Sequence, residues 1–140
     1  MNLLKIFKGM PDSAQVIQKN FETIQDLANK EGHVLYNGNT PMGPSINFGF
    51  PSGMTLESLK FGVIIEFDNV STDGAFVGRS IAHFWPKVLG TTTLATFHLF
   101  DNTNAPALKF MRISSTNIQG HTENDQGNRA QIRVRKIILW

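Results

Sequence analysis

Apolar side chains recur at every second position through most of the chain after residue 45. Ile46, Phe48 and Phe50 alternate with polar residues or glycine, and a similar period returns over 61–67. Successive residues of a β-strand point to opposite faces, so this period gives each strand one apolar face. Further segments of this type cover 76–85, 94–100, 108–114 and 131–139, and polar loops lie at 101–106 and 119–128. Six or so short strands predict a mainly β fold, an antiparallel β-sandwich that is jelly-roll-like.

One α-helix is predicted over 12–31, ahead of the strands. Asp12 is placed as its N-cap, with Gln15 positioned for a capping box, and Gly32 supplies a stop. Apolar residues spaced by three or four positions share one helix face; here they are Ile17, Phe21, Ile24 and Ala28. The face is too short for an autonomous coiled coil. We therefore expect Ile17, Phe21 and Ile24 to dock on the chain's own sheet or on a partner subunit.

The composition of the sequence changes at the end of this helix, near residues 31–33. Asparagine, glycine and proline then crowd residues 37–44, which predicts a turn-rich connection. The expected organisation is a helical segment, 1–32, followed by a sandwich domain, 33–140. A chain of 140 residues is long enough for one such domain.

Charge and cysteine content exclude several classes of protein. Thirteen Lys and Arg residues nearly balance eleven Asp and Glu residues, which is too even for a nucleic-acid-binding protein. The absence of cysteine excludes disulfides and thiolate metal sites, and it suits a protein made in a reducing cytoplasm. The apolar start of the chain is interrupted by Lys5 and Lys8, so we expect no signal peptide and no membrane insertion.

No arrangement of reactive residues predicts catalysis. His83 and His98 would form a two-histidine metal site if their strands were neighbours, but no third ligand accompanies them. Glu66 and Asp68 share one strand face, as carboxylates on any solvated sheet do. We expect no enzyme activity, and no catalytic residue, cofactor or metal ion.

Three other side chains are candidates for interaction. Trp85 lies beside a turn, with His83 and Lys87 as polar neighbours, so its ring could stack on a sugar; the alternative is that it fills the sandwich core. Arg133 and Arg135 point to the strand face opposite Ile132 and Val134. They could meet carboxylates of a partner, or they belong to an ordinary solvated face.

Three stretches of the sequence resemble a known group of proteins. Residues 7–21 contain a Gly9-Met10 step, a helix start with small residues, and Asn20-Phe21 inside the helix. Residues 108–121 run from an aromatic-containing strand into Thr-x-Ile-x-Gly-His, and 132–138 close the chain with an apolar and arginine pattern. These features resemble small tail or baseplate structural proteins from siphophages of Gram-positive bacteria, of the Bacillus siphophage type. Residues 59–63 depart from that group, because Leu-Lys-Phe-Gly-Val stands in place of its Cys-x-x-Gly-Trp.

The resemblance implies a non-enzymatic structural protein of the virion tail. It implies a β-sandwich similar to the shoulder domains of phage receptor-binding proteins, acting as a docking or scaffold module. The partners would be other tail proteins, or further copies in a dimer or trimer. The alternative that it leaves open is a module that recognises carbohydrate of the host cell wall.

Overall fold

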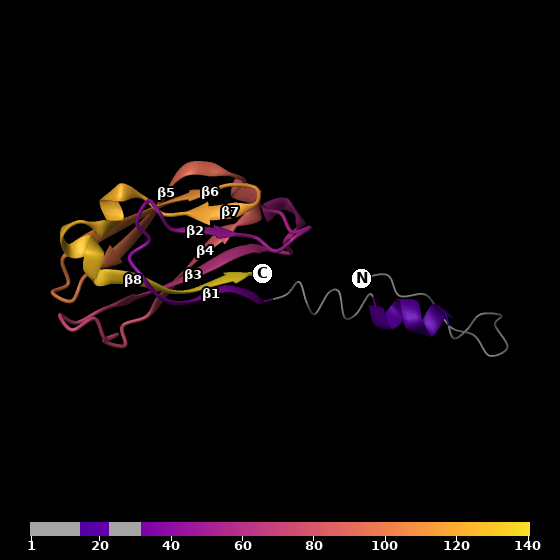
Figure 1. Ribbon diagram of the computed structural model, residues 1–140, viewed down its shortest axis with the longest axis horizontal. Helices are drawn as coiled ribbons and strands as arrows, with labels where there is room; N and C mark the ends of the chain where they lie inside the picture. The colour runs from indigo at the N-terminus through magenta and orange to yellow at the C-terminus, as the bar shows by residue number, and fades with distance from the viewer. Residues whose placement is uncertain (1–14, 23–31) are drawn as a thin grey trace.

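The computed structural model describes residues 15–22 and 32–140, and over the second range two four-stranded antiparallel sheets pack as a β-sandwich (Figure 1). Sheet A has the strand order β1-β8-β3-β4, and sheet B has the order β2-β7-β6-β5. The strands are β1 (His33–Thr40), β2 (Asn47–Gly49), β3 (Gly62–Asn69), β4 (Ile81–Pro86), β5 (Thr92–Phe100), β6 (Pro106–Ile113), β7 (Asn117–Gln119) and β8 (Ile132–Leu139). Four short 3-10 helices connect them: η1 (Leu56–Ser58), η2 (Lys87–Leu89), η3 (Thr122–Asp125) and η4 (Gly127–Gln131). The predicted sandwich is confirmed.

The chain winds like a jelly roll only at its outer pairs. Strand β1 pairs with β8 in sheet A, and β2 pairs with β7 in sheet B. The β1–β2 and β7–β8 connections therefore both cross from one sheet to the other. Further in, β3 pairs with β4 within sheet A, and β5 pairs with β6 within sheet B. Local hairpins therefore replace the inner crossings that would complete the jelly-roll winding.

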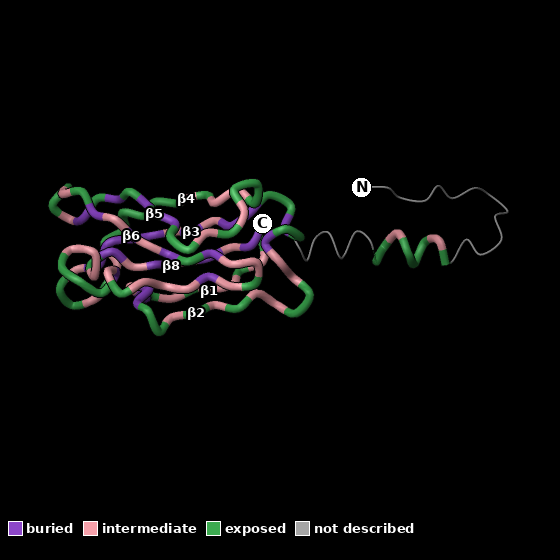
Figure 2. Tube along the Cα trace, turned by 90° about the horizontal axis from the view of Figure 1, so that it is seen from above, coloured by how far each residue is buried: buried purple, intermediate pink, exposed green. Residues whose placement is uncertain are grey.

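The core consists of the alternate residues of both sheets that face one another. Buried positions alternate with exposed or half-buried ones along β5, β6 and most of β8 (Figure 2). Phe67 of sheet A meets Phe97 of sheet B with 5.4 Å between ring centroids, and Tyr36 of β1 meets Phe48 of β2 at 4.4 Å. Together with buried aliphatic side chains from β3, β6 and β8, these contacts join the two sheets.

Two strands were not predicted from the sequence. Strand β1 occupies residues expected in the turn-rich connection, and it tolerates Asn37, Gly38 and Asn39 because it is an edge strand with two register irregularities against β8. Strand β7 is three residues long, but its Ile118 is fully buried. The sandwich therefore has eight strands where six or so were expected.

Strand β4 begins five residues later than predicted. The Asp68 carboxylate accepts hydrogen bonds from the backbone N–H of Arg79 at 2.9 Å and from the Ser80 hydroxyl at 3.1 Å. The backbone before Ile81 is thereby tied to a side chain, and regular pairing with β3 starts only at the Phe67–Ile81 pair. Residues 70–80 form a loop that contains a single bridge, between Val70 and Phe76.

The described part of the N-terminal segment is an α-helix over residues 15–22. Its position agrees with the predicted helix, while the predicted cap at Asp12 and the continuation over 23–31 lie outside the described residues. Gln18 and Glu22 form an i, i+4 hydrogen bond of 3.0 Å on its surface.

Gly120 follows β7 at a point where the backbone passes very close to the connection between β1 and β2. A Cβ atom at this position would lie 2.0 Å from the carbonyl oxygen of Met42 and 2.3 Å from that of Gly43. A Cβ atom built on Gly49, in the neighbouring strand β2, would have no atom within 4 Å. Close approach of two backbones is thus the reason for glycine at 120.

We expect Gly120→Ala to destabilise the sandwich by about 2 kcal/mol or more, because Met42 and Gly43 must shift to admit the methyl group. The matched control Gly49→Ala should change the free energy of unfolding by less than about 0.5 kcal/mol. Urea denaturation followed by circular dichroism measures both. Equal stability of the two variants would contradict the close approach.

Candidate docking surface

A row of apolar side chains crosses the outer face of sheet A. Val34, Ile138, Ile64 and Phe84 are direct cross-strand partners on β1, β8, β3 and β4. Their chain neighbours, such as Val63, Ile65 and Leu139, are buried in the core, so by alternation these four point outward. Val34 is 48% exposed and Phe84 is 47% exposed. We call these four residues the outer row.

Two further aromatic side chains extend the outer row at one end. Trp140 exchanges backbone hydrogen bonds with Gly62, at 2.8 and 2.9 Å, which holds the C-terminus against the start of β3. Its ring lies 4.9 Å from that of Phe61 and 6.2 Å from that of Phe84. Phe61 and Trp140 are both exposed. A contiguous apolar surface rimmed by polar residues is typical of a protein–protein contact.

The sequence contained a signal for this surface that the alternation argument passed over. Val63-Ile64-Ile65 and Ile137-Ile138-Leu139 are consecutive apolar residues. A strand with such a run is apolar on both faces. One face of β3 and β8 fills the core, and the other face, with Ile64 and Ile138, has no covering element among the described residues.

The predicted docking residues of the helix also lie at the surface. Ile17 is 42% exposed and Phe21 is 65% exposed, and they occupy one face of the helix because they are four residues apart. Ile24 lies outside the described residues. The sandwich of the same chain therefore leaves Ile17 and Phe21 uncovered.

Trp85 packs partly against the core. Its indole N–H donates a hydrogen bond of 3.0 Å to the carbonyl oxygen of Gly90, and its ring lies against the buried cluster between the sheets. This placement corresponds to the core-filling alternative, and it leaves the ring only partly accessible.

Of the two candidate arginines, Arg135 lies on the outer face of sheet A with Glu66 and Asp68, as predicted from alternation. Arg133 donates to the carbonyl oxygen of Ala130 at 2.8 Å. The Arg135 guanidinium contacts the chain's own carboxylates, Asp68 at 3.4 Å and Glu66 at 3.9 Å. The carboxylates that contact Arg135 thus belong to the same chain and not to a partner.

A small hollow lies where the free edges of β4 and β5 meet the loop that follows β5. Its volume is about 380 Å³. Exposed Ile81 and Phe100 form its apolar wall. The polar wall is contributed by Asn69, Arg79, Asp101 and Asn104.

Asp101 shapes the loop beside this hollow. Its carboxylate accepts hydrogen bonds from the Thr103 hydroxyl at 2.7 Å and from the backbone N–H groups of Thr103 and Ala105 at 2.8 and 2.9 Å. These hydrogen bonds, led by that of the Thr103 hydroxyl, lower the pKa of Asp101 to about 2. The loop holds Asn104 in the left-handed region at φ 63°, where its side-chain oxygen lies 3.5 Å from the Arg79 guanidinium. The hollow thus combines an exposed phenyl ring with a guanidinium and amides.

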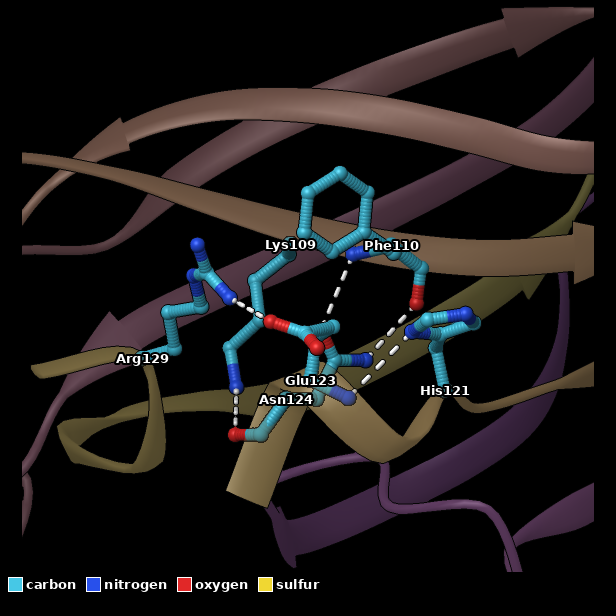
Figure 3. Close-up of polar contacts among 6 residues, drawn as sticks. All are labelled: Lys109, Phe110, His121, Glu123, Asn124 and Arg129. Atoms are coloured by element: carbon cyan, nitrogen blue, oxygen red, sulfur yellow. Dashed lines mark hydrogen bonds and ion pairs between the residues drawn. The ribbon is translucent and has the colours of Figure 1, made fainter. Parts of the chain in front are cut away.

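A buried polar network anchors η3 to β6 (Figure 3). The Asn124 side chain accepts from the backbone N–H of Phe110 at 2.9 Å and donates to the carbonyl oxygens of Phe110 and Met42 at 2.7 and 2.9 Å. Arg129 forms an ion pair with Glu123 of η3, and its guanidinium lies 5.3 Å from the Phe110 ring of β6. All the side-chain atoms of Asn124 that can form hydrogen bonds are satisfied by backbone groups, which suits a structural role.

Lys109 enters the same network from the inner face of β6 and is fully buried. Its amine donates to the carbonyl oxygens of Pro41 at 2.9 Å and Asn124 at 3.1 Å. Burial, and then the nearby Arg133 guanidinium, lower the pKa of Lys109 to about 7. A neutral amine has two N–H groups, and these two carbonyl oxygens use both.

The two histidines of the predicted pair come close to each other, because the His83 side chain hydrogen-bonds the backbone of His98, but they lie on different sheets. His83 faces inward on β4, between the rings of Phe67 and Phe97, and burial lowers its pKa. His98 is exposed on β5, which belongs to the other sheet. Among the described residues no group of three or more His, Cys, Asp or Glu side chains is placed to hold a metal ion.

No helix in the described ranges has the length and apolar character needed to cross a membrane. Comparison with protein-family models, with curated proteins and with solved structures gives no significant match to this chain.

We expect the stability of the protein to rise between pH 7 and pH 9 because of Lys109. The pKa of this amine is about 7 in the folded chain and 10.5 when it is unperturbed. Between these values the unfolded chain binds a proton that the folded chain has lost, so raising the pH favours folding by up to about 1.4 kcal/mol per pH unit.

Urea denaturation at pH 7 and pH 9 measures this effect. The wild-type chain should gain up to about 2 kcal/mol, and Lys109→Met should lack that part of the gain because it has no amine. Parallel pH dependence in the two proteins would show that Lys109 keeps its proton in the fold.

Proposed function

We propose that this protein is a non-enzymatic structural component of a bacteriophage tail, and that it works by docking through the outer face of sheet A. The outer row is the observation that supports the docking role. The resemblance of residues 7–21 and 108–121 to tail and baseplate proteins supports the location in the virion.

The physical argument concerns the exposed surface of the outer row. Removing apolar surface from water stabilises a complex by roughly 25 cal/mol per Å² before the costs of association are subtracted. Phe84, Phe61 and Trp140 supply large rings at one place, and aromatic side chains are enriched among the residues that dominate binding energy. Charged side chains lie beside the row, with Lys136 paired opposite Glu66 on the same face. An apolar centre with a polar rim is the usual anatomy of a protein interface.

We expect Phe84→Asp to prevent incorporation of the protein into phage particles while the fold is retained. Phe84 is already half exposed, so a carboxylate there should change the free energy of unfolding by less than about 1 kcal/mol. Within an interface the same carboxylate would be desolvated. Immunogold labelling of purified virions measures incorporation, and labelled tails are expected for the wild-type protein.

The matched control is Thr96→Asp, which places the same charge on an exposed strand position of sheet B. This variant should be incorporated normally. Normal labelling with Phe84→Asp would contradict docking through sheet A, and virions that lack the wild-type protein would contradict the assignment to the tail.

Carbohydrate recognition is a second candidate function, and the hollow beside Phe100 favours it. An exposed phenyl ring next to a guanidinium and amide groups can stack on a sugar ring and donate hydrogen bonds to its hydroxyls. Phe100 is more exposed than Trp85, the residue singled out from the sequence. A saccharide would therefore bind in the hollow beside Phe100, at the end of β5, and not at Trp85.

A titration of the ¹⁵N-labelled protein with N-acetylglucosamine, glucose, galactose and rhamnose, followed by NMR, tests this candidate. Binding should shift the amide signals of residues 100–104, and Phe100→Ala should weaken it at least tenfold, with Leu94→Ala on the same strand as the control. The absence of shifts at 50 mM of each sugar would remove this candidate.

A further inference from the structure

Two apolar surfaces are left uncovered by residues 15–22 and 32–140, the part of the chain that the structure describes. One is the face of the helix that presents Ile17 and Phe21, and the other is the outer row with Phe61 and Trp140. Both are exposed within a single chain. Exposed apolar surfaces of this kind on one protein can cover one another once two copies meet.

We propose that the helix of one copy lies across the outer row of a second copy, so that Ile17 and Phe21 pack on Ile64, Ile138 and Phe84. This inference deepens the proposed function, on which it rests, because it names a second copy of the chain as the partner of the docking surface.

The dimensions of the two surfaces agree. Eight helical residues, 15–22, extend over about 12 Å at 1.5 Å per residue. The outer row crosses four strands, and three spacings of about 4.8 Å make it about 14 Å long. Ile17 and Phe21 lie about 6 Å apart along the helix axis, close to one strand spacing. A helix perpendicular to the strands would therefore place these two side chains over adjacent members of the row.

The connection between helix and sheet is long enough for an exchange between copies. Residues 23–33 separate the helix from Val34, and eleven residues reach at most about 40 Å when extended. Val34 is itself the first member of the outer row, so the connecting chain starts beside the surface that the other copy's helix would occupy. Two copies related by a two-fold axis would each donate one helix and receive one, which closes the assembly.

The charges at the edges are compatible with this arrangement. Glu22 follows Phe21 on the helix, whereas Lys60 lies over the Phe61 ring and Lys136 lies on β8 opposite Glu66. The polar side of the helix, with Lys19, would face solvent. Opposite charges at the rim favour one orientation of the helix without requiring a buried ion pair.

Disulfide trapping tests the proposal on the purified full-length protein, because the natural chain has no cysteine. A chain with Phe21→Cys is mixed with a differently tagged chain with Phe84→Cys, the pair is oxidised mildly, and the mixed disulfide is quantified by mass spectrometry. We expect at least tenfold more mixed disulfide than with either control pair. The controls are Lys19→Cys with Phe84→Cys, from the opposite helix face, and Phe21→Cys with Thr96→Cys, from the opposite sheet.

Equal yields in the three mixtures would overturn the proposal. A chain that carries both Phe21→Cys and Phe84→Cys and forms only an internal disulfide would overturn it too, since the helix would then cover its own sheet. Light scattering during size-exclusion chromatography gives an independent measurement: the wild-type protein should be dimeric and Phe21→Asp monomeric with an unchanged circular dichroism spectrum. A monomeric wild-type protein at 100 µM would contradict the inference.

The two proposals fail in different ways. Loss of incorporation with Phe84→Asp, without a Phe21–Phe84 cross-link, would leave docking intact and remove the second copy as the partner. A specific cross-link in a protein that is absent from virions would leave the dimer intact and remove the tail assignment.

Discussion

The pairing of β8 with both β1 and β3 is the interaction on which the rest of the molecule depends. The last strand of the chain lies between the first and the third, so sheet A closes only when residues as distant in the sequence as His33 and Leu139 meet. One face of β8 supplies Ile132, Val134, Ile137 and Leu139 to the core. The other face places Ile138 at the centre of the outer row. The same strand therefore organises the interior and the candidate docking surface.

The polar groups inside the sandwich have a different task, which is to hold irregular segments against the sheets. Asn124 and Lys109 bond to backbone carbonyls of the β1–β2 connection, β6 and η3, where no strand ladder can satisfy those groups. Asp68 and Asp101 accept hydrogen bonds from backbone N–H groups of the loops after β3 and β5. Because a buried unpaired carbonyl or N–H costs free energy, such side chains let short loops close a small sandwich. The low pKa of Lys109 follows from the burial of its amine, which in the neutral form still donates two hydrogen bonds.

The docking surface and the carbohydrate candidate occupy separate parts of the molecule. The outer row lies on the face of sheet A, with its aromatic end at Phe61 and Trp140, whereas the hollow at Phe100 lies between the free edges of β4 and β5. Subunit contacts through the first would leave the second open. A single small domain could in this way be held in an assembly and still present a binding edge.

The sequence by itself determined the fold class, because period-two alternation requires strands with one apolar face and two such sheets bury those faces best against each other. It also predicted a helix over 12–31, of which residues 15–22 are described as helical, and the inward or outward direction of residues such as Ile132 and Arg135. Strands β1 and β7 were not predicted from the sequence, because an edge strand and a three-residue strand owe their pairing to partners distant in the chain. Only the tertiary structure decided which apolar residues remain exposed. Local periodicity gives the direction of a side chain, but whether Phe84 or Trp85 meets solvent depends on which element covers that face.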